Sequence, residues 1–393
     1  MSTTTVTAQA NLRREASIEL ASSNGDGLPD RTYDSVYTRF SNVQKSSMTA
    51  FIAFGGLMAS MSTTSILAAV PEVAESFHTT PTAINISNAV YLVFVGLSCC
   101  FWGPWADVFG RKSVQRGASL GWFAGGCMLG PAFGPLVSGV IVTYTSWRII
   151  FWLQAGLAGI GLVQAIFILH ETLQQLRYKE LRGKGLYYGM VKLWEWSNPW
   201  TVFKLFGQKN LFCVCLASAT TAWNMYSLLT PIRFVLNPRL GLTSPLQSGL
   251  LYLAPGAGYL LGTQIGGRLA DRVVKSWMIR RGFRLQEDRL RAGMLTLGVI
   301  LPGTTLLYGW SVERSIGGVA LPGIYIMQHQ SGKASASHYL MRYIFSAVAT
   351  ASCLPLIEAV GVGWTVTVSS AMVWMGSGLI LLTIMKGERW RTV

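Results

Sequence analysis

Charged residues are scarce in this chain of 393 residues, of which Asp, Glu, Lys and Arg together make up 12%. A soluble domain typically carries about 25% charged residues, so this composition argues against a soluble protein. Histidine is scarcer still, because the sequence holds only His78, His170, His329 and His338, far apart. Without a cluster of His or acidic residues, the sequence predicts no metal site and no catalytic residues. We therefore expect a protein that is not an enzyme and that needs no cofactor.

Cysteine provides no structural framework either. The six cysteines lie inside apolar runs, and none has metal-ligand spacing with a histidine. We expect most of them to act as small hydrophobic residues. They are Cys99, Cys100, Cys127, Cys213, Cys215 and Cys353.

Hydrophobic residues, in contrast, make up 51% of the chain and are gathered in long runs. The formal net charge is +15, and the cations fall in the gaps between these runs. Cations placed in this way are typical of the cytoplasmic loops of membrane proteins, so they indicate topology and not a nucleic-acid partner. The sequence thus predicts an all-α integral membrane protein whose surroundings are a lipid bilayer.

About nine apolar runs are long enough to cross a bilayer as helices. A further run, Ile316–Met327, is too short to cross a hydrocarbon core of about 30 Å. The basic loop at residues 268–291 and the basic tail after Met385 are both expected in the cytoplasm. This placement requires one more membrane crossing between Trp310 and Tyr339. The nine runs are Ser47–Val70, Ile86–Trp105, Gly117–Thr143, Ile149–Leu169, Leu211–Leu229, Gly249–Gly266, Ala292–Trp310, Tyr339–Val360 and Trp364–Met385.

The runs fall into two groups. Residues 47–172 predict an N-terminal helical bundle and residues 211–385 a C-terminal one. Residues 173–210 between them are rich in Lys and Arg and predict a cytoplasmic middle loop. Three tryptophans indicate that part of this loop lies along the membrane surface, namely Trp194, Trp196 and Trp200.

Both ends of the sequence are polar. Residues 1–46 are rich in Ser and Thr and predict a disordered cytoplasmic tail, with no apolar core of a signal peptide. Residues 386–393 predict a cytoplasmic C-terminal tail. Both termini are thus expected on the cytoplasmic side.

A polar turn follows the second apolar run. Gly103 and Asp107 precede Gly110, Arg111 and Lys112, so one carboxylate lies beside two cations at the end of a membrane helix. A charge at a membrane boundary is costly unless it has a partner, and a glycine allows a sharp reversal of the chain. The segment predicts a tight turn between two membrane helices.

A weaker copy of this pattern occurs downstream, where Gly267, Asp271 and Arg272 also end an apolar run. Two copies of one pattern indicate a protein built from two related halves.

The third run contains a stripe of small residues. Gly126, Gly130, Gly134 and Ser138 are four residues apart and therefore share one helix face, which lets another helix approach to backbone distance. Pro135 removes a helix hydrogen bond, so a bend is expected there. Generic packing of small residues is the competing interpretation.

Two further groups of residues are candidates for a role. Trp147 and Arg148 suit an anchor at the membrane interface. Trp223, Asn224 and Tyr226 are polar or aromatic residues within an apolar run and are candidates for a cavity wall. Helix packing with local hydrogen bonds explains the second group equally well.

Together these motifs resemble those of the major facilitator superfamily. The segment Gly103–Lys112 is similar to the loop motif after that family's second span. The stripe Gly130, Gly134, Pro135, Ser138 and Gly139 is similar to the fifth-span motif of its antiporters, with Ser138 where Gly is usual. Further matches to fungal members of the drug:proton antiporter branch are Trp147–Arg148, Glu171–Thr172 and Glu287–Arg291.

The chain departs from the family's twelve-span pattern in two places. After Lys112 it passes almost directly into Arg116 and Gly117, where the family has its third and fourth spans, about 60 residues with their loops. The tenth span is reduced to Ile316–Met327. The family's fourth span carries an arginine linked to proton coupling, and no residue here corresponds to it.

The resemblance implies a two-bundle helical transporter that works by alternating access. Asp107 and Arg111 would form a conformational latch, and a proton gradient would drive multidrug efflux or the export of organic acids or fungal metabolites. It implies a small-molecule substrate, protons as coupling ion and a monomer in the plasma membrane, or otherwise in the vacuolar membrane. We expect Asp107→Asn to lower transport without abolishing membrane insertion.

Other functions stay open at this point. An importer or uniporter of a small polar solute would share the fold, although the Gly-Pro stripe favours export. A truncated product that does not transport is favoured by the absent spans. A membrane enzyme is disfavoured, because it would need an acid or His cluster.

Overall fold

The protein is described from a computed structural model, which covers residues 41–109, 118–168, 200–242, 244–282, 287–314 and 336–391. Within these ranges the chain forms helices joined by turns, and no strand is present. The prediction of an all-α fold is confirmed. The short apolar run Ile316–Met327 and most of the middle loop lie outside the described residues.

Within the described residues, the first half of the chain contributes four long helices. Their apolar runs contain few charged residues, and the described turns at residues 77–80 and 145–147 are short. The elements are α3 (Asn42–Thr64), η1 (Ser65–Ala68), α4 (Val70–Ser76), α5 (Pro81–Phe109), α6 (Ala118–Tyr144) and α7 (Arg148–Ile168).

The second half contains longer helices with more interruptions. Among its elements, α16 consists of two helical segments, because Gly361 between them has a φ of 84° and a ψ of 172°. The elements are α9 (Trp200–Lys204), η3 (Leu205–Gly207), α10 (Lys209–Leu229), η4 (Ile232–Leu236), α11 (Asn237–Leu240), α12 (Pro245–Leu251), α13 (Leu253–Arg281), α14 (Asp288–Leu295), η5 (Thr296–Ile300), α15 (Leu301–Glu313) and α16 (Ala336–Arg391).

Six helical stretches of the described residues are long and apolar enough to cross a membrane, and the sixth, His338–Gly387, contains both segments of α16. The distribution of exposed and buried side chains fits a lipid surrounding. Trp152 and Phe167 on α7 are both 76% exposed, whereas polar side chains such as Ser369 and Thr350 are buried. Apolar residues outside and polar residues inside are what a bilayer requires.

Three of the differences between the observed helix boundaries and the sequence prediction concern the ends of α3, α13 and α16. α3 already begins at Asn42, within the predicted tail, because Ser41 caps it and forms a capping box with Gln44. α13 does not end at Gly266 but continues to Arg281. It ends where Gly282 adopts the left-handed conformation, with a φ of 81°. α16 continues past residue 385 to Arg391.

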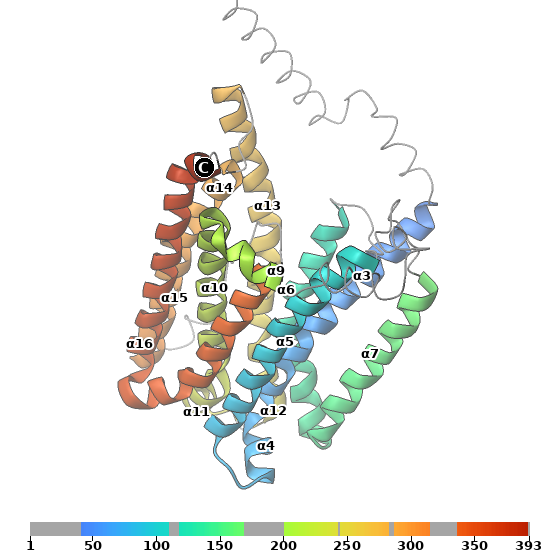
Figure 1. Ribbon diagram of the computed structural model, residues 1–393. Coiled ribbons are helices and arrows are strands. Elements are labelled where there is room, and N and C mark those ends of the chain that lie inside the picture. Colours follow the sequence, from blue (N-terminus) through green and yellow to red (C-terminus); the bar gives the residue numbers. More distant parts are fainter. Residues whose placement is uncertain are drawn as a thin grey trace, which may run out of the picture.

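The two halves lie side by side with their long helices roughly aligned (Figure 1). From the first half, α5 contacts α16, and α6 contacts α12 and α13. The α3–α6 pair forms the centre of the first half, and α7 packs on α3 at its edge. The C-terminus and α14 lie at one end of the molecule, while α4, α11 and α12 lie at the other (Figure 1).

Candidate functional site

The two halves share a buried core at the end that holds α4, α11 and α12. One buried hydrophobic cluster joins Leu67 and Leu92 of the first half to Leu229, Tyr252 and Val366 of the second. The hydroxyl of Tyr252 donates a hydrogen bond of 3.0 Å to the carbonyl oxygen of Leu229. The halves thus share one core at this end.

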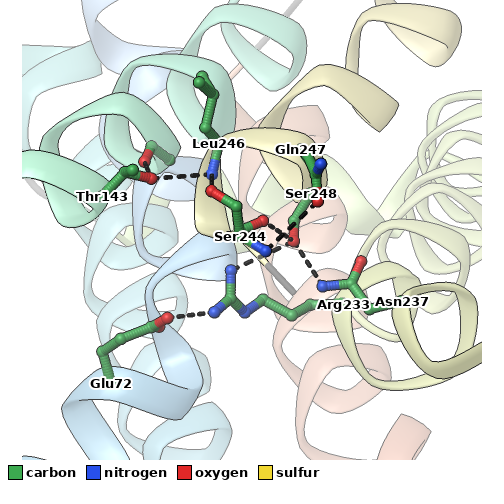
Figure 2. A network of polar contacts seen from close by, with 9 residues as sticks. Glu72, Thr143, Arg233, Asn237, Ser244, Leu246, Gln247 and Ser248 are labelled. Carbon is green, nitrogen blue, oxygen red and sulfur yellow. Dashed lines mark hydrogen bonds and ion pairs between the residues drawn. The ribbon is translucent and has the colours of Figure 1, made fainter. Parts of the chain in front are cut away.

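An ion pair crosses the boundary within this region. The guanidinium of Arg233 in η4 donates to the carboxylate of Glu72 in α4, and these residues are 161 positions apart in the sequence (Figure 2). The Arg233 side chain is 8% exposed, so the pair is mostly shielded from solvent. A buried charge is costly without its partner, which ties the two halves together here.

Further hydrogen bonds hold the arginine in place. Arg233 Nη1 donates to the Ser248 hydroxyl of α12 over 3.2 Å, and Asn237 Nδ2 donates to the same oxygen over 2.5 Å. That hydroxyl in turn lies 3.2 Å from the carbonyl oxygen of Ser244. We call Glu72, Arg233, Asn237 and Ser248 the end junction (Figure 2).

A second contact between the halves lies beside the end junction. The backbone N–H of Leu246, at the start of α12, donates to Thr143 Oγ1 of α6 over 3.0 Å (Figure 2). The first N–H groups of a helix have no partner within the helix, so a hydroxyl of the other half satisfies one of them. Close by, a Cβ added at Gly139 would lie 2.7 Å from the carbonyl oxygen of Pro245. Gly139 therefore permits α6 and α12 to meet at backbone distance.

The charge of Glu72 is subject to opposing influences. Burial raises the pKa of its carboxyl, while the nearby Arg233 charge lowers it, and the net shift is upward. A close ion pair would by itself suggest a lowered pKa. Burial prevails because removing a carboxylate from water costs more than a single partner returns.

The small-residue stripe of α6 faces α3. A Cβ added at Gly130 would lie 2.4 Å from Ser60 Cβ, and one added at Gly134 would lie 2.7 Å from Thr64 Oγ1. Only residues without side chains allow this approach. The stripe therefore packs two helices of the first half together.

α6 continues as a helix through Pro131 and Pro135. Pro131 has no N–H to give to the carbonyl oxygen four residues earlier, that of Cys127. The Ser60 hydroxyl donates to this oxygen instead, over 2.5 Å. α3 thus replaces a hydrogen bond that proline removes from α6.

The three candidate cavity residues of α10 lie on two different faces of the helix. Asn224 is 2% exposed and bonds within the second half, donating to Thr305 Oγ1 over 3.4 Å and accepting from Ser369 Oγ over 2.9 Å. Tyr226 belongs to the buried cluster that contains Leu67 and Leu92 of the first half, so it faces that half. Two positions along a helix differ by about 200°, which explains the opposite directions. Trp223 packs partly buried against the shared core.

The residues of the two polar motifs are described in part. Gly103 and Asp107 lie in the last turns of α5, while Gly110, Arg111 and Lys112 lie outside the described residues. Gly267, Asp271 and Arg272 lie within α13. The sequence placed this second copy at the end of a span, but the helix continues through it without a break.

Trp147 directly precedes α7, and Arg148 is the first residue of that helix. The Arg148 guanidinium is 4.6 Å from the centroid of the Trp147 ring, a cation–π distance. The same ring packs against Phe77 and Phe151, with centroids 5.6 and 6.1 Å away. This cluster joins the α4–α5 turn to α7.

Two features were not identified from the sequence. One is the pairing of Glu72 with Arg233, which sequence distance conceals. The other is Arg342, a cation within the apolar stretch His338–Gly387. An ionisable residue inside a membrane span is a signal of function and could have identified it. Among the described residues, no group of three or more His, Cys, Asp or Glu could hold a metal ion.

Comparison with known proteins agrees with this architecture. The sequence profile of the Major Facilitator Superfamily matches residues 52–114 and 113–386. The chain is 21% identical to the MFS-type transporter clz19 of Cochliobolus lunatus, over 98% of this chain and 92% of that protein. It is 24% identical to the MFS antiporter QDR1 of Candida albicans, over 88% of this chain and 87% of that protein. It is 20% identical to Citrate exporter 1 of Aspergillus niger, over 90% of this chain and 88% of that protein.

The profile match covers most of the chain, and the helices, their polar interior and their apolar exterior fit a protein embedded in a bilayer. The chain belongs to the major facilitator superfamily and is a multi-pass membrane transporter of small molecules.

Proposed function

We propose that this chain is a proton-coupled exporter that works by alternating access, in which the two halves rock about a site between them. The observation that carries the proposal is the end junction. A polar contact of one ion pair and a few hydrogen bonds closes the boundary at one end, and such contacts can break and re-form. Antiport and outward direction are taken from relatives named as an antiporter and an exporter. The proton as coupling ion is taken from the resemblance to the drug:proton antiporter branch.

The proposed cargo is a drug, an organic acid or a fungal metabolite, and the proposed place is the plasma membrane, with the vacuolar membrane as alternative. The end junction would then face away from the cytoplasm. The basic end of α13, with Arg280 and Arg281 in its last turn, would face the cytoplasm, as the positive-inside rule requires.

The experiment is transport by the purified chain in sealed vesicles. Rhodamine 6G serves as a probe of the drug class, and citrate and 1-naphthoate serve as probes of the organic-acid class, with protein-free vesicles as control. We expect probe flux that is driven by an imposed pH gradient and abolished by a protonophore. Flux that does not depend on the pH gradient would instead support a uniporter. No flux of any of the three probes under a gradient would remove the export proposal.

The latch at Asp107 is tested in the same vesicles. We propose that its carboxylate holds one conformational state, so Asp107→Asn should lower flux while membrane insertion stays normal. Full flux in this variant would refute the latch.

The alternative is a shortened product that does not transport. Two observations favour it: the profile matches in two segments that meet at residues 113 and 114, and the alignment with clz19 runs over 497 positions although this chain has 393 residues. Sequencing the full-length transcript decides the matter. About 60 additional residues after Lys112 and about 20 near Met327 would restore three spans. If the transcript encodes the present sequence, the vesicle assay decides whether the chain transports.

A further inference from the structure

Arg342 places a positive charge deep within the second half. It lies in the apolar stretch His338–Gly387, and its Nη2 is 3.8 Å from the sulfur of Met225. Met225 lies near the middle of the 28-residue stretch Lys209–Leu236 on α10. The guanidinium is therefore at the depth where a bilayer makes charge most costly.

The surroundings of Arg342 are aromatic. Its charge acts electrostatically on Tyr226 of α10, on Tyr259 of α13 and on neighbours in α16. The rings of Tyr339 and Tyr343 are stacked, with centroids 6.4 Å apart and planes at 25°. We call these residues the Arg342 cluster, which consists of Tyr226, Tyr259, His338, Tyr339, Arg342 and Tyr343.

The Arg342 cluster lies at the boundary between the halves. Cys127 of α6, in the first half, is also within electrostatic reach of Arg342. A Cβ added at Gly96 of α5 would lie 3.0 Å from Tyr343 Cβ. Tyr226 and Tyr259 are 3% and 2% exposed, whereas Arg342 is only partly buried. The cation is thus more accessible than Tyr226 and Tyr259, and like Tyr339 and Tyr343 it is partly buried.

We propose that the Arg342 cluster binds the carboxylate of an amphipathic aromatic anion, and this inference rests on the proposed transport function. A guanidinium keeps its charge at any physiological pH and matches the two oxygens of a carboxylate with two parallel hydrogen bonds. Tyrosine rings offer apolar surface for an aromatic body and hydroxyls for polar groups. A cationic drug would meet repulsion at the same place. The substrate class is therefore an organic acid with an aromatic ring.

The test is equilibrium dialysis of the purified chain in lipid nanodiscs, with empty nanodiscs to subtract partition into lipid. The probes are radiolabelled 1-naphthoate and its neutral counterpart 1-naphthamide. We expect naphthoate to bind at least about tenfold more tightly, since hydrogen bonds to charged groups are the strong ones. Equal binding of the two probes, or no binding of naphthoate, overturns the proposal without any variant.

Variants then assign the preference to Arg342. Arg342→Gln should abolish the preference for naphthoate, and Arg342→Lys should keep part of it. Arg268→Gln, which removes a charge from an exposed position of α13, is the matched control and should change nothing. A preference that persists in a monodisperse Arg342→Gln protein overturns the assignment. Binding is measured without flux, so a carboxylate preference in a chain that fails to transport upholds this inference and removes only the export proposal.

Discussion

Glu72 shows how one residue can make a contact between the halves sensitive to pH. Its carboxylate meets Arg233, and on its own helix Glu75 adds a like charge that also raises the Glu72 pKa. Because burial raises this pKa, the folded protein binds a proton at Glu72 more tightly than the unfolded chain does. The contribution of Glu72 to stability is then fully present below the ordinary pKa of a glutamate and is lost as the pH rises through the raised value.

We therefore predict that Glu72→Gln removes part of the pH dependence of stability. Glutamine is neutral at every pH, so the melting temperature of wild type should fall relative to that of the variant as the pH rises from about 4 to about 7. Thermal unfolding in nanodiscs, followed by tryptophan fluorescence, measures this difference. Glu75→Gln, at an exposed position of the same helix, is the control and should retain most of the wild-type trend, because burial is the largest cause of the raised Glu72 pKa and the Glu75 charge the smallest. Parallel curves for wild type and Glu72→Gln would contradict the prediction.

At the scale of the element, α6 packs closely against α3 because the glycines at their contact have no side chains. The backbone of α3 occupies the space beside Gly126, Gly130 and Gly134, and Ser60 supplies the hydrogen bond that Pro131 cannot make. A proline-containing helix is stable here because a neighbouring helix replaces its lost bond. The sequence stripe thus acts through close packing within the first half.

Gly130→Ala should destabilise the protein by about 1–3 kcal/mol, because the new Cβ would meet Ser60 Cβ and force the helices apart. Gly125→Ala is the matched control on the same helix, since nothing lies within 4 Å of its added Cβ. There, the better helix propensity of alanine should leave stability unchanged or slightly higher. Size-exclusion thermostability of the two variants compares them directly. Unchanged or higher stability in both variants would show that helix propensity, not packing, governs α6.

A polar contact with α15 caps the helical segment that follows the break in α16. Glu313, at the end of α15, accepts hydrogen bonds from the backbone N–H groups of Val362 and Gly363 over 2.9 and 3.3 Å. These groups begin the segment after Gly361 and have no partner within it. A carboxylate at this place also suits the helix dipole.

Glu313→Ala should therefore lower stability by about 1 kcal/mol, as the loss of a helix cap does. Glu358→Ala removes an exposed carboxylate of the preceding segment and is expected to have little effect. Thermal unfolding of both variants at one pH makes the comparison. Equal melting temperatures for Glu313→Ala and wild type would mean that water caps the segment equally well.

For the whole molecule, charge and shape give the two ends different character. At the end near the C-terminus, Arg281 pairs with the fully buried Asp288, and Arg291 lies 4.1 Å from the ring centroid of Trp277. The opposite end carries the end junction and the α4–α5 turn (Figure 1). The excess of cations at the first end favours the cytoplasm.

This orientation predicts opposite labelling of two introduced cysteines. Thr79→Cys, in the α4–α5 turn, should react with an impermeant maleimide on intact cells, and Ser276→Cys, near the basic end of α13, only after permeabilisation. Both positions are exposed, and the wild-type chain with its six native cysteines sets the background. Labelling of Ser276→Cys on intact cells would reverse the proposed orientation.

The sequence by itself determined the membrane class, the helical character and most helix positions, because long apolar runs leave a chain in lipid little choice but to form helices. Helical spacing also placed the glycine stripe on one face. The tertiary structure alone decided which groups meet: Glu72 pairs with Arg233 across 161 positions, Asn224 and Tyr226 of one helix serve different neighbours, and Arg342 lies among tyrosines. The spacing of residues along the sequence predicts which of them share a helix face. Which residues that face contacts is decided only by the packing of the helices in the folded protein.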